Sequence, residues 1–74
     1  MGELRIMGRK GDTKVSWDPG NQVEVGEAEK SFVAYRAKGF AAFRTTKGGN
    51  KGKQITVFDP NAEEILFVPP IAGG

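Results

Sequence analysis

The residues best suited to chemistry close the sequence, in the run EEILFVPPIAGG at positions 63–74. Pro69 and Pro70 lack a backbone N–H and favour an extended chain, so this segment should leave the folded body as a stiff arm. Gly73 and Gly74 have no side chain and would fit a slot too narrow for a Cβ atom. The reactive group at the tip is then the α-carboxylate of Gly74. A partner enzyme could activate it with ATP, by transferring AMP to form a mixed anhydride.

The remaining composition argues against chemistry in the body itself. The 74 residues include neither cysteine nor histidine, which removes disulfides, thiolate and imidazole metal ligands, and catalysis by either side chain. The acidic residues form no paired-carboxylate or nucleophile–base pattern. The run GGNKGK at 48–53 lacks the ending of a phosphate-binding P-loop, because Gln54 follows Lys53. We therefore expect no enzyme activity, no bound metal and no bound organic cofactor.

Length and the first residues set further expectations. A chain of 74 residues has room for one domain with one core. The opening MGELRIMGRK is charged from its third residue, so it predicts neither a signal peptide nor a membrane anchor. The absence of cysteine suits the cytoplasm, where we expect the protein to work.

Periodicity predicts the elements that hold the arm. Residues 3–7 and 13–18 alternate apolar and polar side chains, as half-buried strands do, and the glycine-flanked segment 8–12 between them predicts a hairpin turn. From Val25 the spacing becomes helical, with one apolar stripe ending near a glycine that should cap the helix. The stripe and the cap are Val25, Ala28, Phe32, Tyr35 and Gly39.

Three more strands follow the predicted helix. They are expected at 40–46, 54–58 and 64–68, with a flexible basic loop at 47–53. The last strand is apolar on both faces, which favours a central position with the first strand as its parallel neighbour. The order β-β-α-β-β-β with one helix on one face of a mixed sheet predicts an α+β protein of the β-grasp, or ubiquitin-like, fold. Residues 1–68 would form this domain and residues 69–74 the projecting arm.

The closing run resembles a known family. EEILFVPPIAGG is similar to the C-terminus of the molybdopterin synthase small subunit, of the MoaD/ThiS type of ubiquitin-like sulfur carriers. That family ends on an acidic pair, an apolar strand, Pro-Pro, an aliphatic residue, a small residue and Gly-Gly. The segment QITVFDP at 54–60 also resembles its penultimate strand and turn. The matching residues are Glu63, Glu64, Ile65, Phe67, Pro69, Pro70, Ile71, Gly73 and Gly74.

This resemblance implies a function and a set of partners. An E1-like enzyme would adenylate the terminal carboxylate, which would become a thiocarboxylate for sulfur transfer or be conjugated to another protein. Gly74 would be the acyl carrier and Gly73 its slot-fitting neighbour. The remaining contacts would be made to the activating enzyme, to a large synthase subunit or to target proteins, through Pro69, Pro70, Ile71, Phe58 and Phe67.

Two other functions stay open at this point. The chain could be a small nucleic-acid-binding module, because basic residues gather in the segment 44–53 and aromatic residues could stack on bases. It could also be a protein-interaction domain with a fortuitous tail. The basic and aromatic candidates are Arg9, Lys10, Lys14, Arg44, Lys47, Lys51, Lys53, Trp17, Tyr35, Phe40 and Phe43. Most of these aromatic residues fall on apolar faces, which favours packing over nucleic-acid binding.

Overall fold

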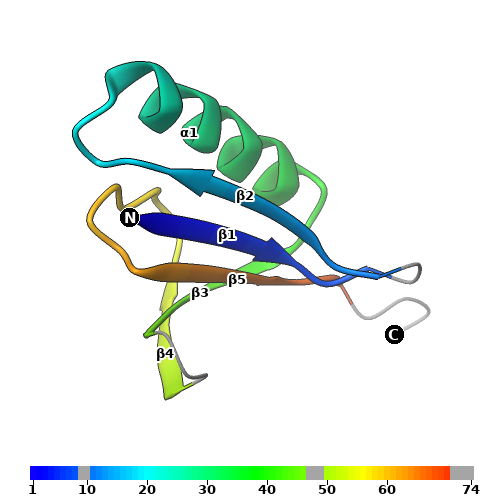
Figure 1. Ribbon diagram of the computed structural model, residues 1–74. Coiled ribbons are helices and arrows are strands. Elements are labelled where there is room, and N and C mark those ends of the chain that lie inside the picture. The colour runs from blue at the N-terminus through cyan, green and yellow to red at the C-terminus, as the bar shows by residue number, and fades with distance from the viewer. Residues whose placement is uncertain (9–10, 47–49, 71–74) are drawn as a thin grey trace.

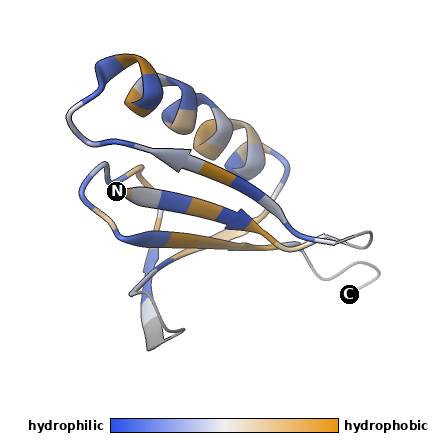
Figure 2. Cartoon of the chain, viewed as in Figure 1, coloured by the Kyte–Doolittle hydropathy of each residue, from blue (hydrophilic) through white to orange (hydrophobic). Residues whose placement is uncertain are grey.

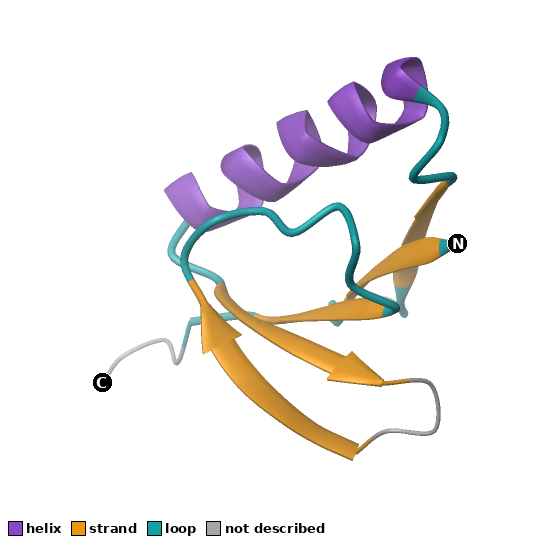
Figure 3. Cartoon of the chain, turned by 90° about the vertical axis from the view of Figure 1, so that its left-hand side faces the viewer, coloured by secondary structure: helices purple, strands orange, loops and turns teal. Residues whose placement is uncertain are grey.

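The computed structural model describes residues 1–8, 11–46 and 50–70, and it forms a five-stranded mixed sheet with one helix on one face (Figures 1 and 3). The predicted order of strands and helix is confirmed. The elements are β1 (Gly2–Ile6), β2 (Thr13–Trp17), α1 (Gln22–Ala37), β3 (Ala41–Thr46), β4 (Asn50–Ile55) and β5 (Glu64–Val68).

The last strand occupies the centre of the sheet. The strand order is β2-β1-β5-β3-β4, in which β5 pairs in parallel with β1 and antiparallel with β3. The two expectations for this strand, a central place and β1 as parallel neighbour, are therefore confirmed. The arrangement is consistent with the predicted β-grasp layout.

The helix begins earlier than the sequence predicted. Asn21 is its N-cap, and its side-chain oxygen accepts hydrogen bonds from the backbone N–H groups of Val23 and Glu24 at 3.0 and 3.2 Å. The start predicted at Val25 was wrong because this cap lies ahead of the apolar stripe. Consequently Glu24, which also accepts a bond from the Asp18 N–H at 2.8 Å, is the acid of the first turn.

The core lies between the helix and the covered face of the sheet. The predicted helical stripe is confirmed, since Ala28 and Phe32 are buried and Val25 and Tyr35 pack against the core. Phe32 contacts Phe67 and Phe58 with ring centroids 5.3 and 5.8 Å apart. The buried apolar residues are Leu4, Ile6, Trp17, Ala28, Phe32, Ala42, Phe58, Ala62, Ile65 and Phe67.

Alternation of side chains explains how β1 meets this core. Leu4 and Ile6 point into it, whereas Glu3 and Arg5 lie on the opposite face, which no helix covers. Figure 2 shows this period of two as alternating hydrophilic and hydrophobic bands along β1. We call the uncovered side the open face of the sheet. Along β1, the open face therefore presents polar, partly exposed side chains.

The fourth strand lies elsewhere than the sequence indicated. A strand was predicted at 54–58, but β4 spans Asn50–Ile55 and pairs with β3 across an irregularity between Arg44 and Thr46. A Cβ on Gly52 would overlap the Arg44 carbonyl, so glycine permits this close pairing. After Ile55 the chain leaves the sheet, and the flexible loop expected at 47–53 is in part strand. Residues 47–49 lie outside the described part.

Within the described residues, no helix is long and apolar enough to cross a membrane.

A prediction concerns the first strand. Gly2 is buried against the indole ring of Trp17, and a Cβ on Gly2 would overlap three ring atoms. Gly2→Ala should therefore lower the free energy of unfolding by about 1–3 kcal/mol through overpacking. Chemical denaturation with urea measures this change.

Gly26 provides the matched control for that substitution. It lies inside α1, and a Cβ there meets no atom within 4 Å. Gly26→Ala should raise the free energy of unfolding by about 1 kcal/mol, from helix propensity alone. Equal effects of the two substitutions would contradict the packing of Trp17 on Gly2.

Candidate functional site

The arm begins where the two central parallel strands end. The Met7 N–H donates a hydrogen bond to the Phe67 carbonyl at 3.1 Å. This bond extends the β1–β5 pairing nearly to the C-terminal end of β5. Pro69 and Pro70 follow and are exposed. Figure 1 shows the C-terminal ends of β1 and β5 side by side. We call this region the arm exit and define it by Met7, Gly39, Phe40 and residues 68–70.

The C-terminal end of the helix forms one side of the arm exit. Gly39 has a φ of 92°, and its N–H donates to the Arg36 carbonyl at 3.0 Å. The Phe40 N–H donates to the Tyr35 carbonyl at 3.1 Å. These two bonds are the pair that defines a Schellman motif, and the accompanying apolar contact joins the rings of Tyr35 and Phe40 at 5.2 Å. The predicted cap at Gly39 is confirmed.

Aromatic contacts tie this helix end to the last strand. The Tyr35 ring lies 5.5 Å from the Phe67 ring, measured between centroids, as well as against Phe40. Tyr35 therefore joins the helix, the cap and β5. Pro70 lies near the same helix end, because an ideal Cβ built on Gly39 would lie 3.7 Å from its Cγ and 3.8 Å from its Cβ.

Two basic side chains stand at the same helix end. The Arg36 guanidinium donates to the Phe40 carbonyl at 2.8 Å, and the Lys38 ammonium lies 5.0 Å from the centre of the Tyr35 ring. Positive charges at the C-terminal end of a helix interact favourably with the negative end of the helix dipole. Neither of them makes an ion pair within the described residues. The arm exit is therefore positively charged on its helix side.

An apolar strip on the open face leads to the arm exit. Cross-strand neighbours Phe43 and Leu66, and then Ala41 and Val68, alternate with the core positions of β3 and β5. All four are partly exposed, so the strip continues along the surface to Pro69. Sequence reasoning missed this strip, although the apolar residues on both faces of the last predicted strand signalled it. Met7 was also missed, and it is 45% exposed beside the strand end.

A polar network holds the opposite end of β5. The buried Glu64 carboxylate accepts a hydrogen bond from the Thr45 hydroxyl at 2.7 Å and lies 4.0 Å from the Arg5 guanidinium. Arg5 also pairs with Asp12 at 3.2 Å. The network crosses β3, β5 and β1 on the open face, so it fixes these three strands relative to each other. It has a structural explanation and needs no ligand.

The residues predicted to act fall into three groups. Pro69 and Pro70 lie exposed at the arm exit, as expected of arm residues. Phe67 is fully buried and Phe58 is 8% exposed, so neither ring offers a surface to a partner. The expectation that these two rings contact a partner is therefore corrected, because both rings are packed in the aromatic core. Ile71, Gly73 and Gly74 lie outside the described residues.

Among the described residues, the groups suggested for nucleic-acid binding are not gathered into a surface. Trp17 is fully buried and its indole N–H donates to the Pro60 carbonyl at 2.9 Å. Arg44 pairs with Asp59 at 3.2 Å, which offsets its charge. Lys14 and Lys53 are exposed on β2 and β4, the opposite edges of the sheet. The other basic candidates lie outside the described residues, as do the surroundings of Lys51.

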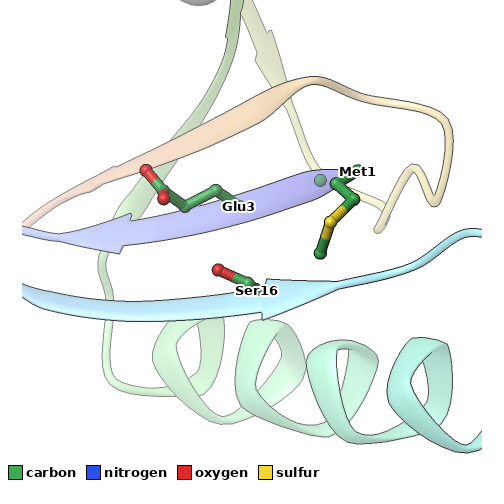
Figure 4. Close-up of a pocket in the computed structure, with 4 residues that line it drawn as sticks. Met1, Glu3 and Ser16 are labelled. Carbon is green, nitrogen blue, oxygen red and sulfur yellow. The ribbon is translucent and has the colours of Figure 1, made fainter.

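A shallow depression lies at the far end of the sheet from the arm exit. It has a volume of about 140 Å³ and is lined by Met1, Gly2, Glu3 and Ser16 (Figure 4). One carboxylate, one hydroxyl and one thioether form no catalytic arrangement. The described residues also contain no cluster of three or more side chains able to hold a metal ion. The arm exit is therefore the candidate site.

No protein-family model, curated protein or solved structure matches the chain.

A prediction follows from the buried carboxylate at the start of β5. Thr45→Val removes the hydroxyl donor and leaves Glu64 buried with one partner fewer, which should lower the free energy of unfolding by about 1–3 kcal/mol. Denaturant unfolding of the variant measures the loss. Thr13→Val on β2 is the matched control, because Thr13 is exposed, and it should stay within about 0.5 kcal/mol of the parent. Equal stabilities of the two variants would contradict the role of the Thr45–Glu64 bond.

Proposed function

We propose that this chain is a ubiquitin-like β-grasp protein whose C-terminal glycine carboxylate is activated by an adenylating enzyme. The activated acyl group would then accept sulfur, as a thiocarboxylate, or be conjugated to another molecule. The chain would act as a carrier or modifier, and bond-making would take place in the partner. ATP would be consumed by the partner and not held by this chain.

One observation carries this proposal. The central strand runs directly into Pro69 and Pro70, which are exposed beyond its end, and the sequence then continues Ile-Ala-Gly-Gly. Apolar residues that follow a buried strand ordinarily return to the core, whereas these are preceded by two residues that favour an extended chain. Such an arm has a clear use if a second protein receives it.

The surroundings of the arm support the same function. The open face presents an apolar strip of Ala41, Phe43, Leu66 and Val68 that ends at the arm. Exposed apolar strips of this kind suit contact with another protein. An activating enzyme could cover the strip while it receives the arm, so that docking and insertion are one event.

The chemistry of the carboxylate explains why a partner enzyme is needed. A carboxylate is a poor acyl donor until its oxygen becomes part of a good leaving group. Transfer of AMP from ATP forms an acyl adenylate and releases pyrophosphate. Attack by a sulfur nucleophile on that carbonyl then forms the new C–S bond and expels AMP. The side chains at the arm exit offer no group for either step, so both require the partner.

The test is the state of the native C-terminus. Protein purified from its native host should carry either a thiocarboxylate on Gly74, heavier by the difference between sulfur and oxygen, or a covalent conjugate through the same carbonyl. Intact mass spectrometry distinguishes the two products, and it also establishes whether Gly74 is the last residue in the cell. Deletion of Gly74, or addition of one alanine after it, should abolish both products.

A control separates loss of activation from loss of folding. Lys30→Ala changes an exposed residue on the helix, away from the arm exit, and should keep the products of the parent chain. If the native protein has an unmodified carboxylate under all growth conditions, and the added alanine leaves its biological role intact, the proposed function is wrong.

A further inference from the structure

The outer side of β2 has backbone groups that the sheet does not use. The Glu3 N–H donates a hydrogen bond at 3.1 Å to the carbonyl just ahead of β5, so the backbone of Glu3 faces β5. Successive residues of a strand face opposite neighbours, so Leu4 faces β2, where it lies opposite Val15. By the same alternation, the N–H and carbonyl groups of Lys14 and Ser16 point away from β1. We call these two residues and their outward groups the β2 edge.

The β2 edge is accessible. β2 is an outermost strand in the order β2-β1-β5-β3-β4 (Figure 1). Lys14 and Ser16 are exposed, and their outward groups have no hydrogen-bond partner among the described residues. Just beyond the strand, the Asp18 N–H is already bonded to the Glu24 carboxylate at 2.8 Å, so the edge is short. Unpaired strand edges of this kind are templates for pairing with another strand.

Charged side chains on the open face form two rows that run across the sheet from this edge. Lys14 lies opposite Arg5, which makes the first row positive. Ser16 lies opposite Glu3, and Glu3 lies opposite Glu64, which makes the second row acidic. Neither Lys14 nor Glu3 has an ion-pair partner within the described residues. Glu3 and Ser16 also line the shallow depression of Figure 4, so the acidic row can be reached from the edge.

We propose that the β2 edge pairs in antiparallel orientation with the same edge of a second copy of this chain, so that the two sheets become one. In this pairing Lys14 lies opposite Ser16 of the second copy, and Val15 lies opposite Val15 of the second copy. Each Lys14–Ser16 pair exchanges two backbone hydrogen bonds, so every outward group of the edge gains a partner. This inference goes beyond the proposed function and does not depend on it.

The charges of the open face favour this register over its neighbours. The positive row of each copy continues into the acidic row of the other, because Glu3 lies directly behind Ser16. Strand spacing puts about 10 Å between the backbones of Lys14 and the second copy's Glu3, which their two side chains can span together. A register with Lys14 opposite Lys14 would bring like charges together. A register with Ser16 opposite Ser16 would place Lys14 opposite Asp18, whose N–H is bonded to Glu24.

Other features of β2 also suit a second copy. Val15 is partly buried and packs against the core, so its exposed part would be covered by Val15 of the second copy. The two acids that flank the strand have partners in their own chain, since Asp12 pairs with Arg5 at 3.2 Å and Asp18 accepts from the Gly20 N–H at 2.9 Å. The other edge strand, β4, carries two lysines and no acidic residue, so two copies of β4 would bring like charges together.

Such a dimer leaves the arm exit uncovered. A pair of identical edges related by a two-fold axis is self-complementary, so β2 pairing ends at two copies. The axis stands perpendicular to the joined sheet, so both open faces point to the same side. Since β1 separates β2 from β5, the apolar strips on β3 and β5 lie away from the junction. The dimer would thus present two strips on one face.

Sedimentation velocity of the purified chain, from micromolar to millimolar concentration, tests the pairing. Because the edge is short, we expect a monomer–dimer equilibrium that moves toward the dimer as concentration rises. Ser16→Pro removes an outward N–H that takes no part in the pairing with β1, and it should raise the dissociation constant by about ten-fold or more. Ser16→Ala is the matched control, because it keeps this N–H, and it should stay within about two-fold of the parent.

An exchange of charges tests the register. Lys14→Glu places an acid near Glu3 of the second copy and should raise the dissociation constant by about three-fold or more. Addition of Glu3→Lys to the same chain restores opposite charges across the junction and should return the constant to within about two-fold of the parent. Thermal unfolding shows whether each variant stays folded. In the parent, hydrogen exchange of the Lys14 and Ser16 amides should slow as concentration rises, with Val15, whose N–H faces β1, as the internal reference.

Several outcomes would overturn the inference. They are a monomer at every concentration, a dimer that tolerates Ser16→Pro, and Lys14 and Ser16 amides whose exchange does not depend on concentration. A monomer in which these amides are protected only by a component of a native-host extract would assign the edge to another protein and overturn pairing with a second copy. If Ser16→Pro does not fold, the charge exchange and the parent's hydrogen exchange decide. None of these outcomes bears on the C-terminal products that test the proposed function.

Discussion

The parallel pairing of β1 with β5 is the constraint on which the rest of the structure depends. It joins the two strands furthest apart in the sequence, and their parallel direction requires a crossover in the connecting chain, which includes the helix. Four aligned residue pairs, from Glu3 with Glu64 to Ile6 with Phe67, place the last strand in the centre. As a result, the residues that follow Val68 begin at a fixed point. A strand at the edge of the sheet would have one neighbouring strand and not two, so the point at which the following residues begin would be held by fewer contacts.

Both faces of β5 contribute to this fixed origin. On the covered face, Ile65 and Phe67 are fully buried under the helix. On the open face, Glu64 bonds to Thr45 and approaches Arg5, so its carboxylate has partners on both neighbouring strands. One end of β5 is therefore held by polar contacts across the sheet and the other by aromatic contacts to the helix. β5 ends at Val68, and Pro69, which has no backbone N–H to donate to a sheet, follows it.

The sequence predicted what depends on local periodicity and failed where distant residues decide. Alternation and helical spacing gave β1, β2, β3, β5 and the apolar face of α1, since each needs a stretch of only a few residues. The segment around Gly52 looks like a loop by composition, and only pairing with β3 makes it a strand. Phe58 reaches the core through a bend that periodicity cannot show. Pro70 lies near Gly39, and no local pattern relates these two residues, so the sequence could not predict that they are close.

The small size of the domain determines how it can take part in chemistry. In the described part of the chain, one helix and five strands bury a single aromatic and aliphatic core. Under the proposed function, such a domain contributes to a reaction by presenting a group, and the value of presentation depends on how well the position and direction of that group are fixed before contact. At the arm exit the helix cap, the Tyr35 ring and the end of β5 converge within a few residues of the last described position. These contacts define where the described part of the chain leaves the sheet.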